Sequence, residues 1–167
     1  MIKAKDTKMN EIMLSALEQA RRTMTENIGG PFGAAIIDAN GKVLAVASNS
    51  VLRDNDPTAH AEVNAIRAAC RKINNYDLSG CVLYTTAYPC PMCLSAIIWS
   101  NIKKVYYGNT REDATHIGFR DDFIYSYIKK LEDNVNGDET LELECMDRED
   151  TLLTFDCFIE KSDKTIY

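Results

Sequence analysis

Four side chains in this sequence have the types and the spacing that metal chemistry requires. His60 lies two residues before Glu62 in the stretch "PTAHAEV", and Cys90 and Cys93 form a C-x-x-C pair in "YPCPMC". One imidazole and two thiolates are ligands that zinc prefers, and three protein ligands leave the fourth tetrahedral position open, as in catalytic zinc sites. Zinc held in this way lowers the pKa of a bound water to near 7. Glu62 is then the candidate general base that takes the proton from this water.

Both motifs are expected at the start of a helix, where their geometry is most useful. Cys90 and Cys93, three residues apart on a first turn, point the same way, and the helix N-terminus favours their thiolate form. Ala61 is small, and its N–H is an unsatisfied donor that is free to bind a substrate atom. A structural zinc site would need a fourth ligand. His116, the only other histidine, falls in a polar segment and is interpreted as a solvated residue.

The pattern of apolar residues and turn residues predicts the elements that carry these motifs. Helices are predicted over residues 10–25, 59–73 with Thr58 as N-cap, 91–100 and 148–161, and a loop leading into a helix over 110–132. A hairpin is predicted over 32–50 with Asn40-Gly41 as its turn, and strands over 81–87, 103–109 and, weakly, 141–146. Segments 51–57 and 133–140 are predicted to be loops. Strands that alternate with helices indicate an α/β sandwich, with a mostly parallel sheet after the hairpin.

Composition limits the classes of partner and compartment. A chain of 167 residues with 46% hydrophobic residues suits a single domain with a sizeable core, and its net charge of -6 argues against a nucleic-acid partner. No stretch has the length of a signal peptide core or a membrane span, so the cytoplasm is the expected location. The six cysteines are then expected to be reduced, with Cys70, Cys81, Cys145 and Cys157 in the core.

The full pattern, H-x-E followed by P-C-x-x-C, is that of zinc deaminases. With "PTAHAEVNAIRAAC" and "PCPMCLSAIIW", the chain resembles the cytidine deaminase-like superfamily. It is most similar to the bacterial guanine deaminases, through "IGGPFGA", "NDPTAHAEV" and "DATHIGFRDDFIY". The resemblance implies a three-layer α-β-α sandwich with a five-stranded mixed sheet over residues 1–167. It also implies one zinc ion bound by His60, Cys90 and Cys93, and Glu62 as the catalytic proton shuttle.

The same resemblance assigns roles in substrate binding. Asn49 matches a residue whose amide binds the purine, and Phe32 matches a wall that stacks on the base. Ala61 contributes its backbone N–H, and Asp121 matches a second acidic, catalytic residue of the guanine pocket, whose carboxylate accepts N–H groups of guanine. In this family the C-terminal segment, here residues 147–167, crosses to a second subunit, and the terminal tyrosine, here Tyr167, closes that subunit's pocket. The resemblance therefore also implies a homodimer.

One departure leaves the substrate open. The family usually has Glu immediately before the Pro-Cys pair, where this chain has Tyr88. The first hypothesis is deamination of guanine to xanthine and ammonia. Deamination of guanosine, cytosine or an aminotriazine, and of adenosine in tRNA, are alternatives from the same superfamily. A zinc-stabilised scaffold without activity is a further alternative, but such a protein would not need Glu62.

Overall fold

The structure is a computed structural model that describes residues 10–133 and 139–166. Its internal contacts divide the chain into two units, Met1–Asp121 and Asp122–Tyr167. No helix in the described part of the chain is long and apolar enough to span a membrane. The residues of the zinc motifs all belong to the first unit.

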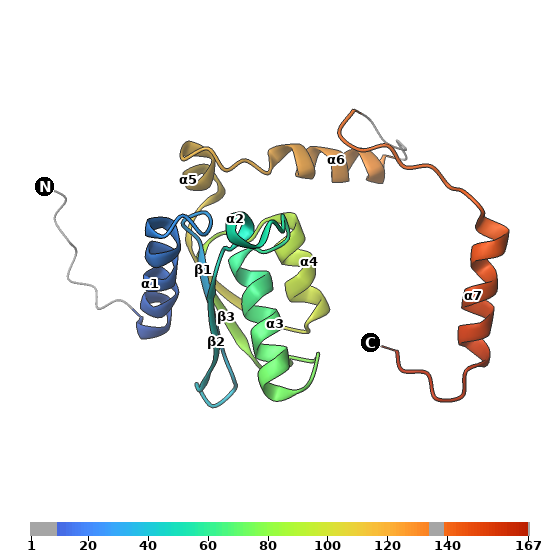
Figure 1. The fold of residues 1–167 in the computed structure, drawn as a ribbon, viewed down its shortest axis with the longest axis horizontal. Coiled ribbons are helices and arrows are strands. Elements are labelled where there is room, and N and C mark those ends of the chain that lie inside the picture. The colour runs from blue at the N-terminus through green and yellow to red at the C-terminus, as the bar shows by residue number, and fades with distance from the viewer. Residues whose placement is uncertain (1–9, 134–138, 167) are drawn as a thin grey trace, which may run out of the picture. The chain divides into compact units, whose positions relative to one another are not determined.

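The first unit is built on a mixed sheet. Its strands are β1 (Gly33–Ile37), β2 (Val43–Ser48), β3 (Val82–Ala87) and β4 (Lys104–Asn109), in the order β2-β1-β3-β4. β1 pairs antiparallel with both β2 and β3, and only β3 and β4 are parallel. Helix α1 (Glu11–Thr25) covers one face, and α3 (Ala61–Ile73) and α4 (Pro91–Trp99) lie on the other (Figure 1). The predicted α-β-α layering is therefore confirmed for this unit.

The predicted five-stranded sheet is wrong for the described residues, where the sheet has four strands. Segment 141–146 contains one isolated bridge residue, Leu141, and is otherwise irregular. Its alternation of leucine and glutamate indicated a half-buried strand. Alternation specifies two faces but does not supply a neighbouring strand edge with which to pair.

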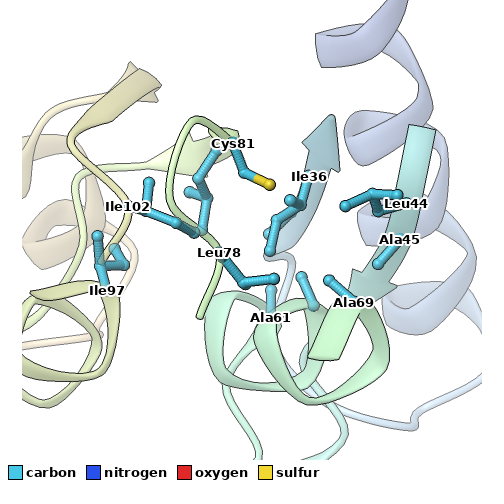
Figure 2. Close-up of a cluster of buried hydrophobic side chains, with 12 residues drawn as sticks. Ile36, Leu44, Ala45, Ala61, Ala69, Leu78, Cys81, Ile97 and Ile102 are labelled. Carbon is cyan, nitrogen blue, oxygen red and sulfur yellow. The ribbon is translucent and has the colours of Figure 1, made fainter. Parts of the chain in front are cut away.

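The core between the sheet and α3 is filled mostly by small and branched side chains. Figure 2 shows Ile36, Leu44 and Ala45 of the hairpin strands in one cluster with Ala61 and Ala69 of α3. The buried alanines of α3 allow the helix to approach the sheet closely. This close packing fixes the N-terminal end of α3, where the candidate zinc ligand lies.

Other elements begin or end differently from the prediction. Helix α3 begins at Ala61, because the hydroxyl and the N–H of Thr58 both bond to Asp56 Oδ1 in a turn, so Thr58 does not cap the helix. Segment 51–57, predicted to be a loop, contains the short helix α2 (Val51–Asp54). The hairpin turn is one residue earlier than predicted: the N–H of Gly41 donates to the carbonyl of Asp38, and Gly41 follows the turn with φ 81°.

The remaining elements are helical. The segment predicted as a loop and a helix forms α5 (Arg111–His116) and α6 (Asp122–Glu132), and the predicted final helix is α7 (Arg148–Glu160).

Cys81 is buried as predicted and Cys70 is half-buried, whereas Cys145 and Cys157 are exposed, contrary to the prediction. Cys157 is exposed because no residue of α7 is buried within the chain.

Candidate active site

Two helix N-termini position the candidate zinc ligands. His60 is the N-cap of α3 and Cys90 is the N-cap of α4, and both have extended backbone conformations (φ -71°, ψ 156° and φ -66°, ψ 168°). Pro91 occupies the first turn of α4, where its missing N–H costs nothing. Cys93 then lies on the same turn as Cys90 and is completely buried.

The three side chains converge at a distance that fits zinc. His60 Nδ1 lies 3.5 Å from the sulfur of Cys90 and 3.5 Å from that of Cys93. All three ligand atoms lie within 4.8 Å of one another. Zinc bonds of about 2.3 Å to sulfur and about 2.0–2.1 Å to nitrogen, set at a tetrahedral angle, place sulfur and nitrogen about 3.5 Å apart. The donor set and its spacing thus fit one zinc ion.

The electrostatics of the sulfur pair favour a thiolate. Hydrogen bonds from Cys93 and His60 lower the pKa of the Cys90 thiol to about 4, against the opposing effect of burial. The pKa of Cys93 is raised because its thiol donates to Cys90 and is itself buried. The pKa of His60 is raised, chiefly by its hydrogen bond with Cys90. The thiolate of Cys90 is the form of cysteine that binds zinc.

Glu62 lies beside this group and away from solvent. Its side chain is 6% exposed, and the hydroxyl of Thr85 in β3 donates to its Oε1 at 3.0 Å. Its Oε2 lies 3.5 Å from the sulfur of Cys93. Burial is the main reason that the pKa of the Glu62 carboxyl is raised, which favours a group that both takes and returns a proton.

A cavity of about 400 Å³ lies at the ends of β3 and β4. Its lining residues come from the loop before β1, the strand ends and α5: Pro31, Phe32, Ala87, Asn109, Asp113, Ala114, His116 and Ile117. The Phe32 ring packs edge-on against Phe119, with ring centroids 4.9 Å apart. Phe32 therefore lines this cavity, and its stacking on a base stays a prediction. His116 is exposed as expected and also lines this cavity.

Asn49 stabilises the loop that contains Phe32 through hydrogen bonds to backbone N–H groups. Its Oδ1 accepts hydrogen bonds from the N–H groups of Gly30 and Val51, both at 3.2 Å. The amide nitrogen makes no hydrogen bond with any residue that the structure describes. The amide was expected to offer a base both a donor and an acceptor. In the structure its acceptor is used by the backbone, and Asn49 itself does not line the cavity.

The structure places the other predicted site residues as follows. Ala61 is fully buried as the first residue of α3. Asp121 is half-buried, with its carboxylate 3.6 Å from the Arg111 guanidinium. It belongs neither to the three-ligand group nor to the cavity lining among the described residues. Tyr167 lies outside the described residues. Tyr88 is exposed and contacts Tyr107 edge-on, with ring centroids 5.1 Å apart.

Comparison with known proteins agrees with this geometry. The family model of the cytidine and deoxycytidylate deaminase zinc-binding region matches residues 6–109. Guanine deaminase of Bacillus subtilis is 49% identical over 115 residues, which cover 69% of this chain and 73% of the relative. The X-ray structure of guanine deaminase from Bacillus subtilis superimposes with a TM-score of 0.87 at 39% identity, over 95% of this chain and 99% of that one.

Two further relatives match over a smaller part of the chain. The tRNA-specific adenosine deaminase of Aquifex aeolicus is 46% identical over 92 residues, 55% of this chain and 60% of the relative. A structure of guanine deaminase from Nitrosomonas europaea has a TM-score of 0.62 at 33% identity, over 66% of this chain and 63% of that one. Since the zinc-binding region matches from residue 6 to residue 109 and contains the His/Cys/Cys group, the chain belongs to the zinc-dependent cytidine and deoxycytidylate deaminase family.

Proposed function

We propose that this protein is a zinc-dependent guanine deaminase, a hydrolase that converts guanine and water to xanthine and ammonia. The observation that carries the proposal is the buried Glu62 carboxylate, held by Thr85 beside the group of His60, Cys90 and Cys93. The similarity to Bacillus subtilis guanine deaminase over most of both chains supports guanine as the substrate.

The proposed mechanism assigns one task to each side chain. His60, Cys90 and Cys93 would hold one zinc ion, whose chemistry is to lower the pKa of a bound water. Glu62 accepts a proton from the water that adds to C2 of guanine. It then delivers a proton to the departing amine, so that the C–N bond breaks and ammonia leaves. Thr85 keeps Oε1 of Glu62 in place through both transfers.

Residues next to the hairpin strands and at the start of α3 are proposed to recognise the base. Phe32 offers a flat face for stacking, and the free amide donor of Asn49 suits the acceptors of a purine, such as a carbonyl oxygen. Ala61 offers its backbone N–H at the start of α3. Asp121 is proposed to accept the N–H groups that guanine has and adenine lacks.

The assembly is proposed to be a homodimer with an exchanged C-terminal segment. The apolar side chains of α7 are exposed within the chain; Phe155, for example, is 68% exposed. Such a helix gains stability when a second surface covers it. We propose that residues 147–167 reach the partner subunit and that Tyr167 closes the partner's pocket.

The test is a panel of bases and nucleosides assayed for ammonia release. Guanine should be turned over, while adenine should be rejected by roughly 10⁴–10⁵-fold, as expected when a site built for particular hydrogen bonds meets an analogue that lacks them. Guanosine should be poor because its ribose needs room. Asp121→Ala should reduce guanine turnover far more than zinc content. A clear preference for guanosine, cytosine or an adenosine-containing tRNA stem-loop would overturn guanine as the substrate while leaving deamination intact.

A further inference from the structure

A second cavity, of about 430 Å³, lies at the β2 edge of the sheet. Its walls come from α1, β2, α2 and α3, and none of its lining residues is shared with the cavity at the ends of β3 and β4. The proposed deamination does not use it. Three arginines, Arg53, Arg67 and Arg71, line it together with a single acidic residue, Asp54. We call it the arginine cavity.

The charge of the arginine cavity contrasts with that of the whole chain. Three arginines and one aspartate line the cavity, whereas the chain as a whole has a net charge of -6. Arg67 and Arg71 are four residues apart on α3, so their side chains lie on the same side of the helix. A concave site lined by one sign of charge concentrates ions of the opposite sign.

Two of the three guanidinium groups are available to a ligand. The Arg71 guanidinium has no hydrogen bond or ion pair with any residue that the structure describes. Arg67 makes only long contacts, 3.5 Å to the carboxylate of Asp56 and 3.3 Å to the hydroxyl of Thr58. Such exposed pairs contribute little, so a ligand can displace them at small cost. Arg53, by contrast, is bound to Asp54 at 2.7 and 3.1 Å.

The base of the arginine cavity is polar and fixed. The amide nitrogen of Asn64 donates to the Ser50 hydroxyl oxygen and to the Ser48 carbonyl, both at 2.9 Å. The Ser50 hydroxyl donates in turn to Asp54 Oδ2 at 2.6 Å. Because Asp54 is already neutralised by Arg53 and bound by Ser50, its charge opposes an anion less than a free carboxylate would. A cavity lined by two available guanidinium groups and by polar groups held through hydrogen bonds suits an anion.

We propose that the arginine cavity binds a small molecule through a phosphate group. Guanidinium groups bind phosphate bidentately, and two of them can share the oxygens of one phosphate or of two linked phosphates. The volume is within the ~300–1,000 Å³ of small-molecule sites, large enough for a nucleotide. Nucleic acid is a less suitable occupant because it needs an extended row of cations, and this chain is acidic outside the cavity.

Calorimetric titration of the zinc-loaded protein tests the proposal. The probes are pyrophosphate, guanosine triphosphate and uncharged guanosine, in the presence of saturating xanthine to occupy the deaminase site. The variant is Arg67→Ala/Arg71→Ala. The matched control is Arg21→Ala/Arg22→Ala, which removes two exposed arginines of α1 that do not line the cavity. Guanine turnover checks that each variant is folded.

The expected result is binding of pyrophosphate or guanosine triphosphate that weakens at least ~10-fold in Arg67→Ala/Arg71→Ala and is unchanged in the control pair, since charge-assisted hydrogen bonds have this magnitude. Tighter binding of the nucleotide than of pyrophosphate would show that the cavity also contacts the nucleoside. The proposal is overturned if neither phosphate probe binds at millimolar concentration, if both variants lose binding equally, or if uncharged guanosine binds as tightly as guanosine triphosphate.

Discussion

Glu62 is the residue on which the proposed chemistry depends most directly. Glu62→Gln keeps the size of the side chain and its hydrogen bond with Thr85 but cannot carry a proton. We expect it to retain zinc and the fold and to lose about 10²–10⁴-fold in kcat, the usual contribution of general acid–base catalysis. Steady-state guanine kinetics and metal analysis check this. Glu18→Gln, on the exposed face of α1, is the matched control, and near-normal turnover of Glu62→Gln would exclude the proposed role.

Thr85 is a positioning residue that acts through Glu62. Its side chain is 1% exposed, and its hydroxyl donates to Glu62 Oε1. Thr85→Val keeps the shape and removes the donor, so kcat should fall ~10–100-fold with little change in KM, because hydrogen bonds to charged groups have this strength. Thr85→Ser should restore most of the rate. Equal activity of the serine and valine variants would show that Thr85 only fills the core.

Substitution of Cys93 tests zinc binding separately from proton transfer. Cys93→Ala removes one of three ligands, and we expect the purified protein to lose most of its zinc, measured by elemental analysis. Cys81→Ala is the control, because Cys81 is also a buried free cysteine but belongs to the apolar core. Full zinc content in Cys93→Ala would mean that the metal lies elsewhere.

At the residue scale, the sequence was sufficient to predict the zinc-motif residues but not the residues that surround them. His60, Glu62, Cys90 and Cys93 were predictable because ligand type and spacing along the chain are themselves chemical constraints. Thr85 was not, since a threonine in a strand gives no sign that a helix will bring a carboxylate against it. The same holds for Asn109, Asp113 and His116, which meet at the cavity only because β4 leads into α5.

At the scale of elements, the loop before β1 shows how backbone packing positions a site residue. A Cβ on Gly29 would lie 2.2 Å from Asn49 Oδ1 and 2.6 Å from its carbonyl oxygen. Gly29→Ala should therefore displace Asn49 and raise KM for guanine while zinc content is retained. Gly41→Ala is the control: its φ of 81° strains any side chain, but no atom lies within 4 Å of the added carbon. It should lower the melting temperature without changing KM, and similar KM values for both variants would contradict this account.

The elements themselves were predictable where local signals dominate. Residue periodicity located α1, Pro91 at the first turn marked α4, and β-branched and aromatic residues located β3. The start of α3 was predicted too early, because the N–H and the hydroxyl of Thr58 bond to Asp56 and Thr58 therefore does not cap the helix. A fifth strand was wrongly predicted over 141–146, because strand formation depends on a partner strand that the alternation of residues does not specify.

At the scale of the whole molecule, the exposed apolar side chains of α7 support the proposed dimer. Leu153, Phe155 and Ile159 are all exposed within the chain. We expect sedimentation to give a dimer at micromolar concentration. Phe155→Glu should shift the protein toward monomer, whereas Glu149→Gln, on the same helix, should not. A fully active wild-type monomer would exclude a shared pocket.

Complementation tests the shared pocket itself. In the proposed dimer each pocket contains Glu62 from one chain and Tyr167 from its partner, so Glu62→Gln and Tyr167→Ala should each impair the homodimer. A purified heterodimer of the two variants contains one pocket with both defects and one with neither. It should recover about half of wild-type turnover, because the sites of a symmetric dimer are equivalent. If Tyr167 closed its own chain's pocket, every pocket of the heterodimer would carry one defect, and turnover would stay at the level of the impaired homodimers.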